Sequence, residues 1–229
     1  MNKGKKKTWV KVLRFVVLAF YLLLVVLPIY WMIVTSFKTN AEIINTQTIT
    51  YWPKVFTLEN YKGLFQTMHY GTYLKNSLIV TLSTAVVVTF LSIYGGYGMA
   101  RFKFKGKTAA LVFFLVTQMI PSILVIIPLY VMFAKFNLID TYVSLFVFYT
   151  ITNLPFCAIT MRSFFERIPY ALEESAYVDG CSRGQTLWKI VMPVMFPGIV
   201  AVFVFAFIGA WNELIAGTIF LNTQKMWTI

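Results

Sequence analysis

The polar segment from Glu173 to Gly198 carries three of the chain's eight acidic residues, within a sequence dominated by hydrocarbon side chains. It reads EESAYVDGCSRGQTLWKIVMPVMFPG. Pro169, just before it, suits the first turn of a helix, and Gly180 suits the left-handed residue after a helix. Ser182 and Gln185 have the spacing of a capping box. The sequence therefore predicts two short helices joined at a glycine, which form either a solvated loop or an element that enters a groove of another protein.

Catalytic or metal-binding chemistry has few candidate residues. His69 is the only histidine, and Cys157 and Cys181 have no CxxC or other metal-ligand spacing. A Ser-His-Asp arrangement has no supporting partners, and the apolar runs lack the paired Asp or His residues that membrane-embedded hydrolysis requires. We therefore predict no metal site, no catalytic site and no bound cofactor, and we expect that the chain is not an enzyme.

Polar residues inside apolar runs are the candidates for binding a solute. Glu213 lies late in the last run beside Trp211 and Asn212, where an acid, an amide and an indole ring would suit a sugar. The alternative is that Glu213 is hydrated at the membrane interface. Gln118 and Asn153 either line a pathway or make hydrogen bonds between helices.

The composition indicates a membrane protein. Of the 229 residues, 59% are hydrophobic and only 12% are charged. Uncharged runs occupy residues 15–37, 76–100, 108–134, 141–161 and 190–212, and the last extends plausibly to residue 221. Since about 20 apolar residues in helical form cross a bilayer, we predict an all-α polytopic protein with five transmembrane helices in a lipid bilayer. The net charge of +12 does not indicate nucleic acid, because no zinc-finger or RNP-type motif accompanies it.

The positions of Lys and Arg predict the orientation. Six basic residues lie in residues 1–14, four between the second and third runs, and four between the fourth and fifth, so that fourteen of twenty share one side. Because basic loops stay in the cytoplasm, we expect a cytoplasmic N-terminus and a cytoplasmic loop 162–193. Loop 38–75 would then lie outside, and residues 15–229 would form one transmembrane domain.

Proline and glycine recur inside the predicted spans. Neighbouring helices satisfy the backbone groups that proline frees, and small residues let helices approach closely. These residues either provide kinks and packing, or Pro121 and Pro128 break a helix that lines a pore so that it can flex.

The polar segment resembles the EAA motif of ATP-binding-cassette (ABC) importer permeases, written E-A-A, three residues, G, nine residues, I-x-L-P. Glu174, Ser175, Ala176 and Gly180 match its first half, and Ile190 and Pro193 its second. Ser175 replaces the usual alanine, and Met192 replaces the usual leucine. Five further stretches are similar to the carbohydrate permeases that resemble the second permease of the maltose-type importer. They are LPIYWMIVTSFK, TLENYKGLF, ARFKFKGK, IPLYVMFAKFNLIDTY and WNE.

The resemblance implies a type I ABC importer permease fold and a set of partners. These would be a companion permease, ATPase subunits that bind ATP and Mg, an extracellular or periplasmic solute-binding protein and a sugar, at a bacterial cytoplasmic membrane. It also implies that Glu174, Ser175, Ala176, Asp179 and Gly180 couple the permease to the ATPase. The family usually has a sixth helix, so either the chain is truncated after its fifth, which we expect, or the subunit lacks that helix. The alternative function is an ion-coupled carrier or channel, with Glu213 as the sole ion-coupling acid.

Overall fold

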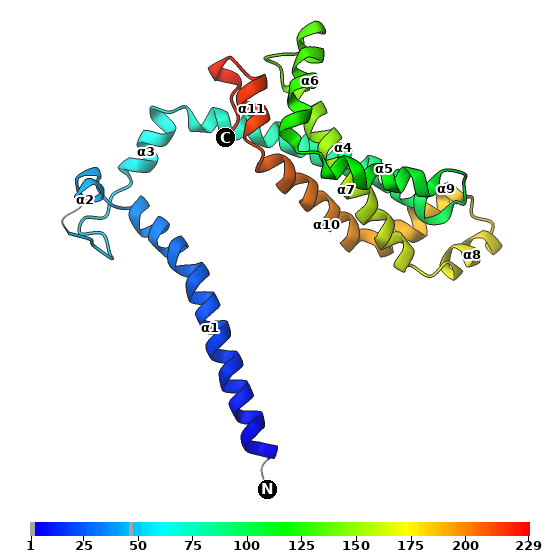
Figure 1. Cartoon of the computed structure of the whole chain (residues 1–229), viewed down its shortest axis with the longest axis horizontal. Coiled ribbons are helices and arrows are strands. Elements are labelled where there is room, and N and C mark those ends of the chain that lie inside the picture. The colour runs from blue at the N-terminus through cyan, green and yellow to red at the C-terminus, as the bar shows by residue number, and fades with distance from the viewer. Residues whose placement is uncertain (1–2, 46–47) are drawn as a thin grey trace. The chain divides into compact units, whose positions relative to one another are not determined.

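The computed structural model describes residues 3–45 and 48–229, with side chains in the first helix from residue 9 onward, and this part of the chain is helical without strands (Figure 1). It forms two compact units, Met1–Tyr70 and Gly71–Ile229. The single domain expected over residues 15–229 stays a prediction. The first unit contains α1 (Lys3–Ser36), α2 (Asn40–Ile44) and α3 (Glu59–Gln66). The predicted basic N-terminus therefore continues into the first span as one helix, although its residues 1 and 2 lie outside the described residues.

The second unit is a helical bundle that begins with the long helix α4 (Tyr70–Arg101). It continues with α5 (Lys107–Met119), α6 (Ser122–Lys135), α7 (Tyr142–Arg167), α8 (Ala171–Val178) and α9 (Arg183–Gln185). A π-helical segment (Thr186–Val191), α10 (Met192–Trp211), α11 (Ile215–Phe220) and a 3₁₀ turn (Gln224–Met226) complete it. Figure 1 shows α8 and α9 at one end of this unit and α11 at the opposite end.

Among the described residues, four helical stretches are long and apolar enough to cross a membrane. They are Trp9–Ser36, Tyr70–Arg101, Tyr142–Arg167 and Arg183–Trp211. A fifth crossing is possible only if α5 and α6 count as one span, because they meet at an angle of 96°. The span predicted over residues 108–134 is therefore two helices with a break between them, which matches the alternative of a proline break, whereas its lining of a pore stays a prediction. Ile120 is extended, with φ −79° and ψ 120°, as the residue before a proline prefers, so the break falls at Pro121, whereas Pro128 lies inside α6.

The last span differs from its prediction at both ends. The second short helix was expected to stop near Pro193, but the helical stretch runs without a break from Arg183 through the π-helical segment to Trp211. Pro193 lies two residues after the π-helical segment, where the hydrogen-bonding pattern changes to that of α10. The proposed continuation to residue 221 is interrupted, since α10 ends at Trp211 and α11 starts at Ile215.

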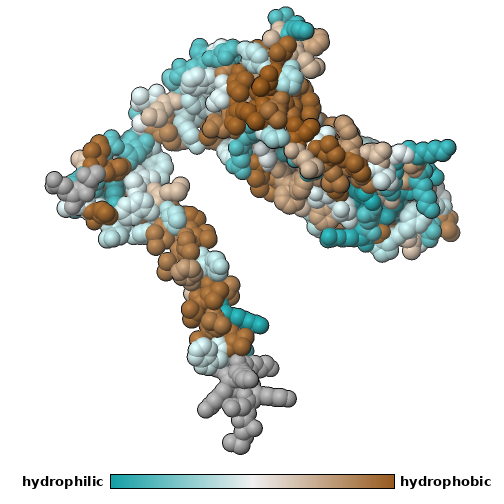
Figure 2. All heavy atoms as spheres, in the orientation of Figure 1, coloured by the Kyte–Doolittle hydropathy of each residue, from teal (hydrophilic) through white to brown (hydrophobic). Residues whose placement is uncertain are grey.

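The core of the second unit is apolar and has two parts. One part joins α4, α7, the π-helical segment and α10, and includes Val88, Met161 and Val202. The other joins α6, α7 and α11 and includes Phe148 and Phe220. Many large apolar side chains remain exposed on the helices, as lipid-facing side chains are in a bundle of this kind. Figure 2 shows hydrophilic residues gathered at the α8–α9 end and hydrophobic residues over α6 and its neighbours.

Candidate functional site

The loop that joins α7 to α10 begins with the short helix α8. Leu172 donates its backbone N–H to the Pro169 carbonyl at 3.2 Å, and α8 itself starts at Ala171, two residues later than predicted. The helix ends at Val178, and Gly180 takes the predicted left-handed conformation after it, with a φ of +84° that L side chains rarely adopt. Cys181 then donates its N–H to the Ala176 carbonyl at 2.9 Å. This closed turn reverses the chain toward the second short helix.

The predicted capping box at Ser182 is confirmed. The Gln185 N–H donates to Ser182 Oγ at 3.3 Å, and the Ser182 N–H donates to Gln185 Oε1 at 2.8 Å. These bonds satisfy two of the backbone donors that a helix start leaves free. The capping box thus fixes the point at which the chain turns back toward the membrane.

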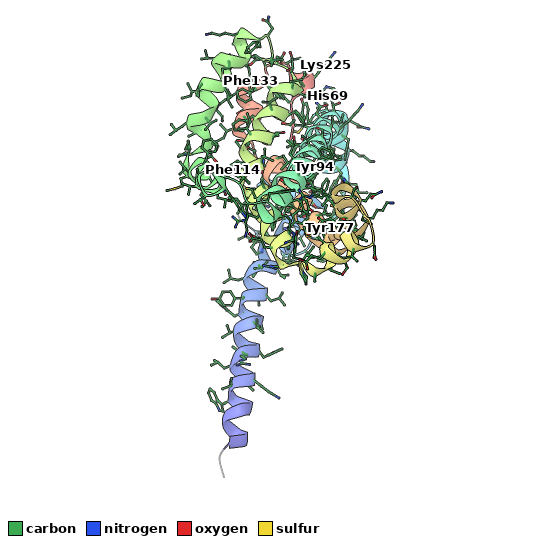
Figure 3. The ribbon with its side chains drawn as sticks, turned by 90° about the vertical axis from the view of Figure 1, so that its right-hand side faces the viewer. His69, Tyr94, Phe114, Phe133, Tyr177 and Lys225 are labelled. Atoms are coloured by element: carbon green, nitrogen blue, oxygen red, sulfur yellow. The ribbon has the colours of Figure 1, made fainter. Side chains whose placement is uncertain are left out.

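The motif residues of α8 divide between two faces. Glu174, Ser175, Asp179 and Gly180 are exposed, whereas Ala176 is only 5% exposed and packs inside its own chain. The neighbouring Tyr177 is partly buried, at the end of the unit opposite Lys225 (Figure 3). Val178, which no motif in the sequence indicated, is 87% exposed. The exposed face therefore combines acidic, small and apolar side chains, a surface suited to a protein partner.

Glu173, the residue before the motif, is the fully buried acid of this loop. Its carboxylate accepts hydrogen bonds from Tyr97 Oη at 2.8 Å and from Arg101 Nε at 2.5 Å, both on α4. The Arg101 Nη2 also donates to the Ile168 carbonyl at 2.9 Å. Glu173 lies more than 70 positions from its partners, so no local pattern could reveal the pair. The only signal in the sequence was a glutamate within a predicted short helix.

Aromatic contacts reinforce this attachment to α4. The Arg101 guanidinium lies 5.8 Å from the centre of the Tyr170 ring, and the Arg183 guanidinium lies 5.3 Å from that of Phe102. Cation–π contacts of this kind add modest attraction. The start of α8 and the start of α9 are thus both held against the end of α4.

The candidate pathway residues do not gather at one place. Trp211 stacks on Phe207 with ring centres 5.4 Å apart, and Asn212 is exposed at the end of α10. Glu213 Oε2 accepts the Ala216 N–H at 2.9 Å and so caps the start of α11. Trp211 and Glu213 border a cavity of only about 10 Å³, which is smaller than a sugar ring.

Asn153 lies between α7 and α10. Its Nδ2 donates to the Tyr149 carbonyl at 2.8 Å, and its Oδ1 lies 2.0 Å from where a side chain on Gly209 would begin. The glycine therefore makes room for the amide. The hydrogen bond of Asn153 stays within α7, so both alternatives for this residue, a pathway lining and a bond between helices, stay predictions.

Gln118 alone of the five borders a large cavity. The cavity has a volume of about 620 Å³ and lies where α5 and α6 break, against α7. Its polar lining consists of Thr117, Gln118, Ser122 and Thr152. Non-helical backbone within a membrane needs protein or water beside it, and a cavity at the break supplies that space.

Metal ligands do not cluster in the described residues. No group of three His, Cys, Asp or Glu side chains there could hold a metal ion. Within the same part of the chain, the other ion pair besides Arg101–Glu173 joins Arg162 to Glu166 on the exposed end of α7.

Comparison with known proteins identifies the class. Residues 89–228 match the family described as binding-protein-dependent transport system inner membrane component, and the chain belongs to this family. It is therefore an ABC importer permease, a multi-pass transport subunit of the inner membrane, as the motif resemblance implied.

Three curated relatives place it more narrowly. The chain is 37% identical to the diacetylchitobiose uptake system permease protein DasC of Streptomyces coelicolor, over 82% of this chain and 68% of that protein. It is 33% identical to the trehalose transport system permease protein SugB of Mycobacterium tuberculosis, over 82% and 68%. It is 30% identical to the trehalose/maltose transport system permease protein MalG of Thermococcus litoralis, over 88% and 72%.

A solved structure confirms the fold. A bacterial ABC transporter involved in the import of the acidic polysaccharide alginate superposes with a TM-score of 0.82 at 20% identity, over 99% of this chain and 78% of that chain. The predicted all-α importer permease fold is thus confirmed.

Proposed function

We propose that this chain forms half of the translocation pathway of an importer for sugars or oligosaccharides. The single observation that carries the substrate class is its similarity to relatives named for diacetylchitobiose, trehalose and maltose. The other half of the pathway is a companion permease. A solute-binding protein outside the membrane delivers the sugar.

Loop 162–193, which we call the coupling loop, is the proposed docking element for the ATPase subunit. Its exposed α8 face, with Glu174, Ser175, Asp179 and Val178, enters a groove of the partner, while Gly180 provides the turn. Ala176 supports this face from inside. ATP and Mg bind to the partner, and its closure on ATP turns the permease between inward-open and outward-open states. This chain contributes motion and no bond chemistry.

The membrane orientation follows from the same proposal. The coupling loop must meet an ATPase in the cytoplasm, so the N-terminus is cytoplasmic and residues 38–75 lie outside. Within the second unit, the α8–α9 end and the α11 end lie opposite each other, as a cytoplasmic end and an outer end would require (Figure 1).

The cavity at the α5–α6 break is the proposed sugar-facing part of the pathway. The side-chain oxygens of Thr117, Gln118, Ser122 and Thr152 offer acceptors for sugar hydroxyls, while the Thr117 and Thr152 hydroxyls donate to carbonyls of their own helices. In transporters, substrates bind where membrane helices are discontinuous. Asn153, Trp211, Asn212 and Glu213 do not line this cavity. The Asn153 amide packs beside Gly209, and the Glu213 carboxylate accepts a backbone N–H at the start of α11.

The alternative, an ion-coupled carrier, is disfavoured by family membership. Its one candidate acid, Glu213, already accepts a backbone hydrogen bond at the start of α11.

Purification of the full transporter through a tag on this chain tests the proposal. We expect an ATPase subunit to copurify, and reconstituted uptake of radiolabelled diacetylchitobiose or trehalose to require Mg-ATP. Glu174→Lys should reduce the copurified ATPase severalfold. Glu166→Lys, which reverses another exposed glutamate at the same end of the unit, should not. Uptake driven by an ion gradient without nucleotide would overturn the proposal.

A further inference from the structure

We propose that Glu173 is a positioning residue which, through Arg101 and Tyr97, makes α8 and the end of α4 move as one body during transport. This inference rests on the proposed role of α8 in docking the ATPase. Glu173 lies outside the exposed motif face, and we assign to it the transfer of the ATPase's motion to a membrane-spanning helix.

The contacts around Glu173 join three separate elements. Its two carboxylate oxygens are bound by two side chains from successive turns of α4, Tyr97 and Arg101. Arg101 also holds the Ile168 carbonyl, at the end of α7. The Tyr97 ring packs edge-on against Phe165 of α7, with ring centres 5.3 Å apart. A displacement of α8 must therefore move the ends of both long helices or break these bonds.

Burial makes the link stiff. The Glu173 side chain is 0% exposed and that of Arg101 is 10% exposed, so water cannot replace either partner at low cost. A buried charge without its partner is strongly unfavourable, and therefore the two groups stay together through any motion that keeps the fold. An exposed pair would exchange with water instead.

The length of α8 explains why it needs such a link. A helix of eight residues is too short to hold its own shape in water. Most of its exposed face is free for a partner, so its orientation depends on the inward-facing residues Glu173 and Ala176. Of these two, only Glu173 bonds directly to a membrane-spanning helix.

The chain offers a matched control in Arg162 and Glu166. They also form a pair with a bond of 2.8 Å, at the same end of the unit. However, the side chains are 24% and 44% exposed, and both belong to α7. Loss of this pair removes an ion pair without cutting any link between elements.

Hydrogen exchange of the purified transporter tests the anchor. In Glu173→Gln and Arg101→Gln, the amides of residues 171–178 should exchange more than about tenfold faster, because α8 opens locally. Tyr97→Phe, which removes one hydrogen bond and no charge, should give a smaller increase. Glu166→Gln should leave α8 unchanged. Unchanged exchange in Glu173→Gln would overturn the anchor, and this measurement holds whether or not an ATPase copurifies.

Coupling is the readout that a purely structural role would not change. The number of ATP molecules hydrolysed per diacetylchitobiose or trehalose transported should rise at least severalfold in Glu173→Gln, with the copurified ATPase still present. The charge-swapped double variant Glu173→Arg with Arg101→Glu should recover part of the coupling that each single change loses. A coupling ratio equal to that of the unmodified chain, or no recovery in the double variant, would overturn the proposal. Absence of an ATPase from the unmodified transporter would instead refute the proposed function.

Discussion

At each end of the second unit a carboxylate joins two segments of the chain, and the two carboxylates differ in burial and in partners. At the α8 end, the Glu173 carboxylate is buried and binds side chains of a long helix. At the α11 end, the Asp140 carboxylate binds the segment that follows α11, accepting the N–H groups of Asn222 and Thr223 at 2.9 Å each and the Thr223 hydroxyl. The first tie joins two charged groups away from water. The second joins one carboxylate to backbone donors near the surface.

This difference separates a stiff joint from an adjustable one. Breaking the Glu173 tie leaves a buried charge, whereas water can replace the partners of Asp140. A transporter driven from one side needs stiffness where force enters. Variants that loosen each end in turn therefore test whether the two ends differ in stiffness.

The largest expected effect comes from Gly96, one residue before Tyr97. A side chain there would lie 2.8 Å from the Arg162 backbone nitrogen and 2.9 Å from Met161 Cβ. Backbone cannot move aside cheaply, so Gly96→Ala should destabilise the unit by about 1–3 kcal/mol. Thermal unfolding of the purified protein, followed by tryptophan fluorescence, measures this loss.

Gly98 provides the matched control two residues later. Nothing lies within 4 Å of where its side chain would begin. Gly98→Ala should therefore stabilise α4, by up to about 1 kcal/mol, since alanine favours a helix. Equal behaviour of the two variants would show that the α8 end of the bundle is not closely packed.

An intermediate effect is expected from Ser182 at the capping box. Ser182→Ala removes the bond to the Gln185 N–H, so the start of α9 should lose about 1 kcal/mol of stability. Faster exchange of the amides of residues 183–186 would report it. Ser175→Ala is the control, because the Ser175 hydroxyl donates to the Ala171 carbonyl within its own helix and caps no free donor. If both serines gave the same change, the cap would not limit the loop.

Local features of the site were predictable from the sequence, and distant ones were not. The cap at Ser182 and the turn at Gly180 depend on residues three or four positions apart, so the local sequence is enough to predict both. The partners of Glu173 come from another helix. Which face of α8 points inward was equally hidden, and this is why Val178 was missed.

The broken third span shows the same limit within one helix pair. Pro121 and Pro128 carry the same local signal, since each lacks a backbone donor. Only Pro121 follows an extended residue and ends a helix. Whether each proline ends a helix depends on the surroundings of its backbone. The sequence therefore predicted a flexible span but not its 96° bend or the cavity beside it.

The smallest expected effect is a pH-dependent loosening at Asp140. The Thr223 hydroxyl, with the N–H groups of Thr223 and Asn222, favours the carboxylate and lowers the pKa of Asp140 below its ordinary value, although partial desolvation opposes this. A lowered pKa in the folded state means that the stabilisation is fully present above the ordinary pKa of about 3.9. It is lost as the pH falls through the lower, folded-state pKa.

Protection of the Asn222 and Thr223 amides from exchange should therefore hold at pH 5 and fall only in more acidic solution. In Asp140→Asn, protection should be weaker and independent of pH in this range. Loss of protection already near pH 5, or the same acid response in Asp140→Asn, would mean that another group ties down this end.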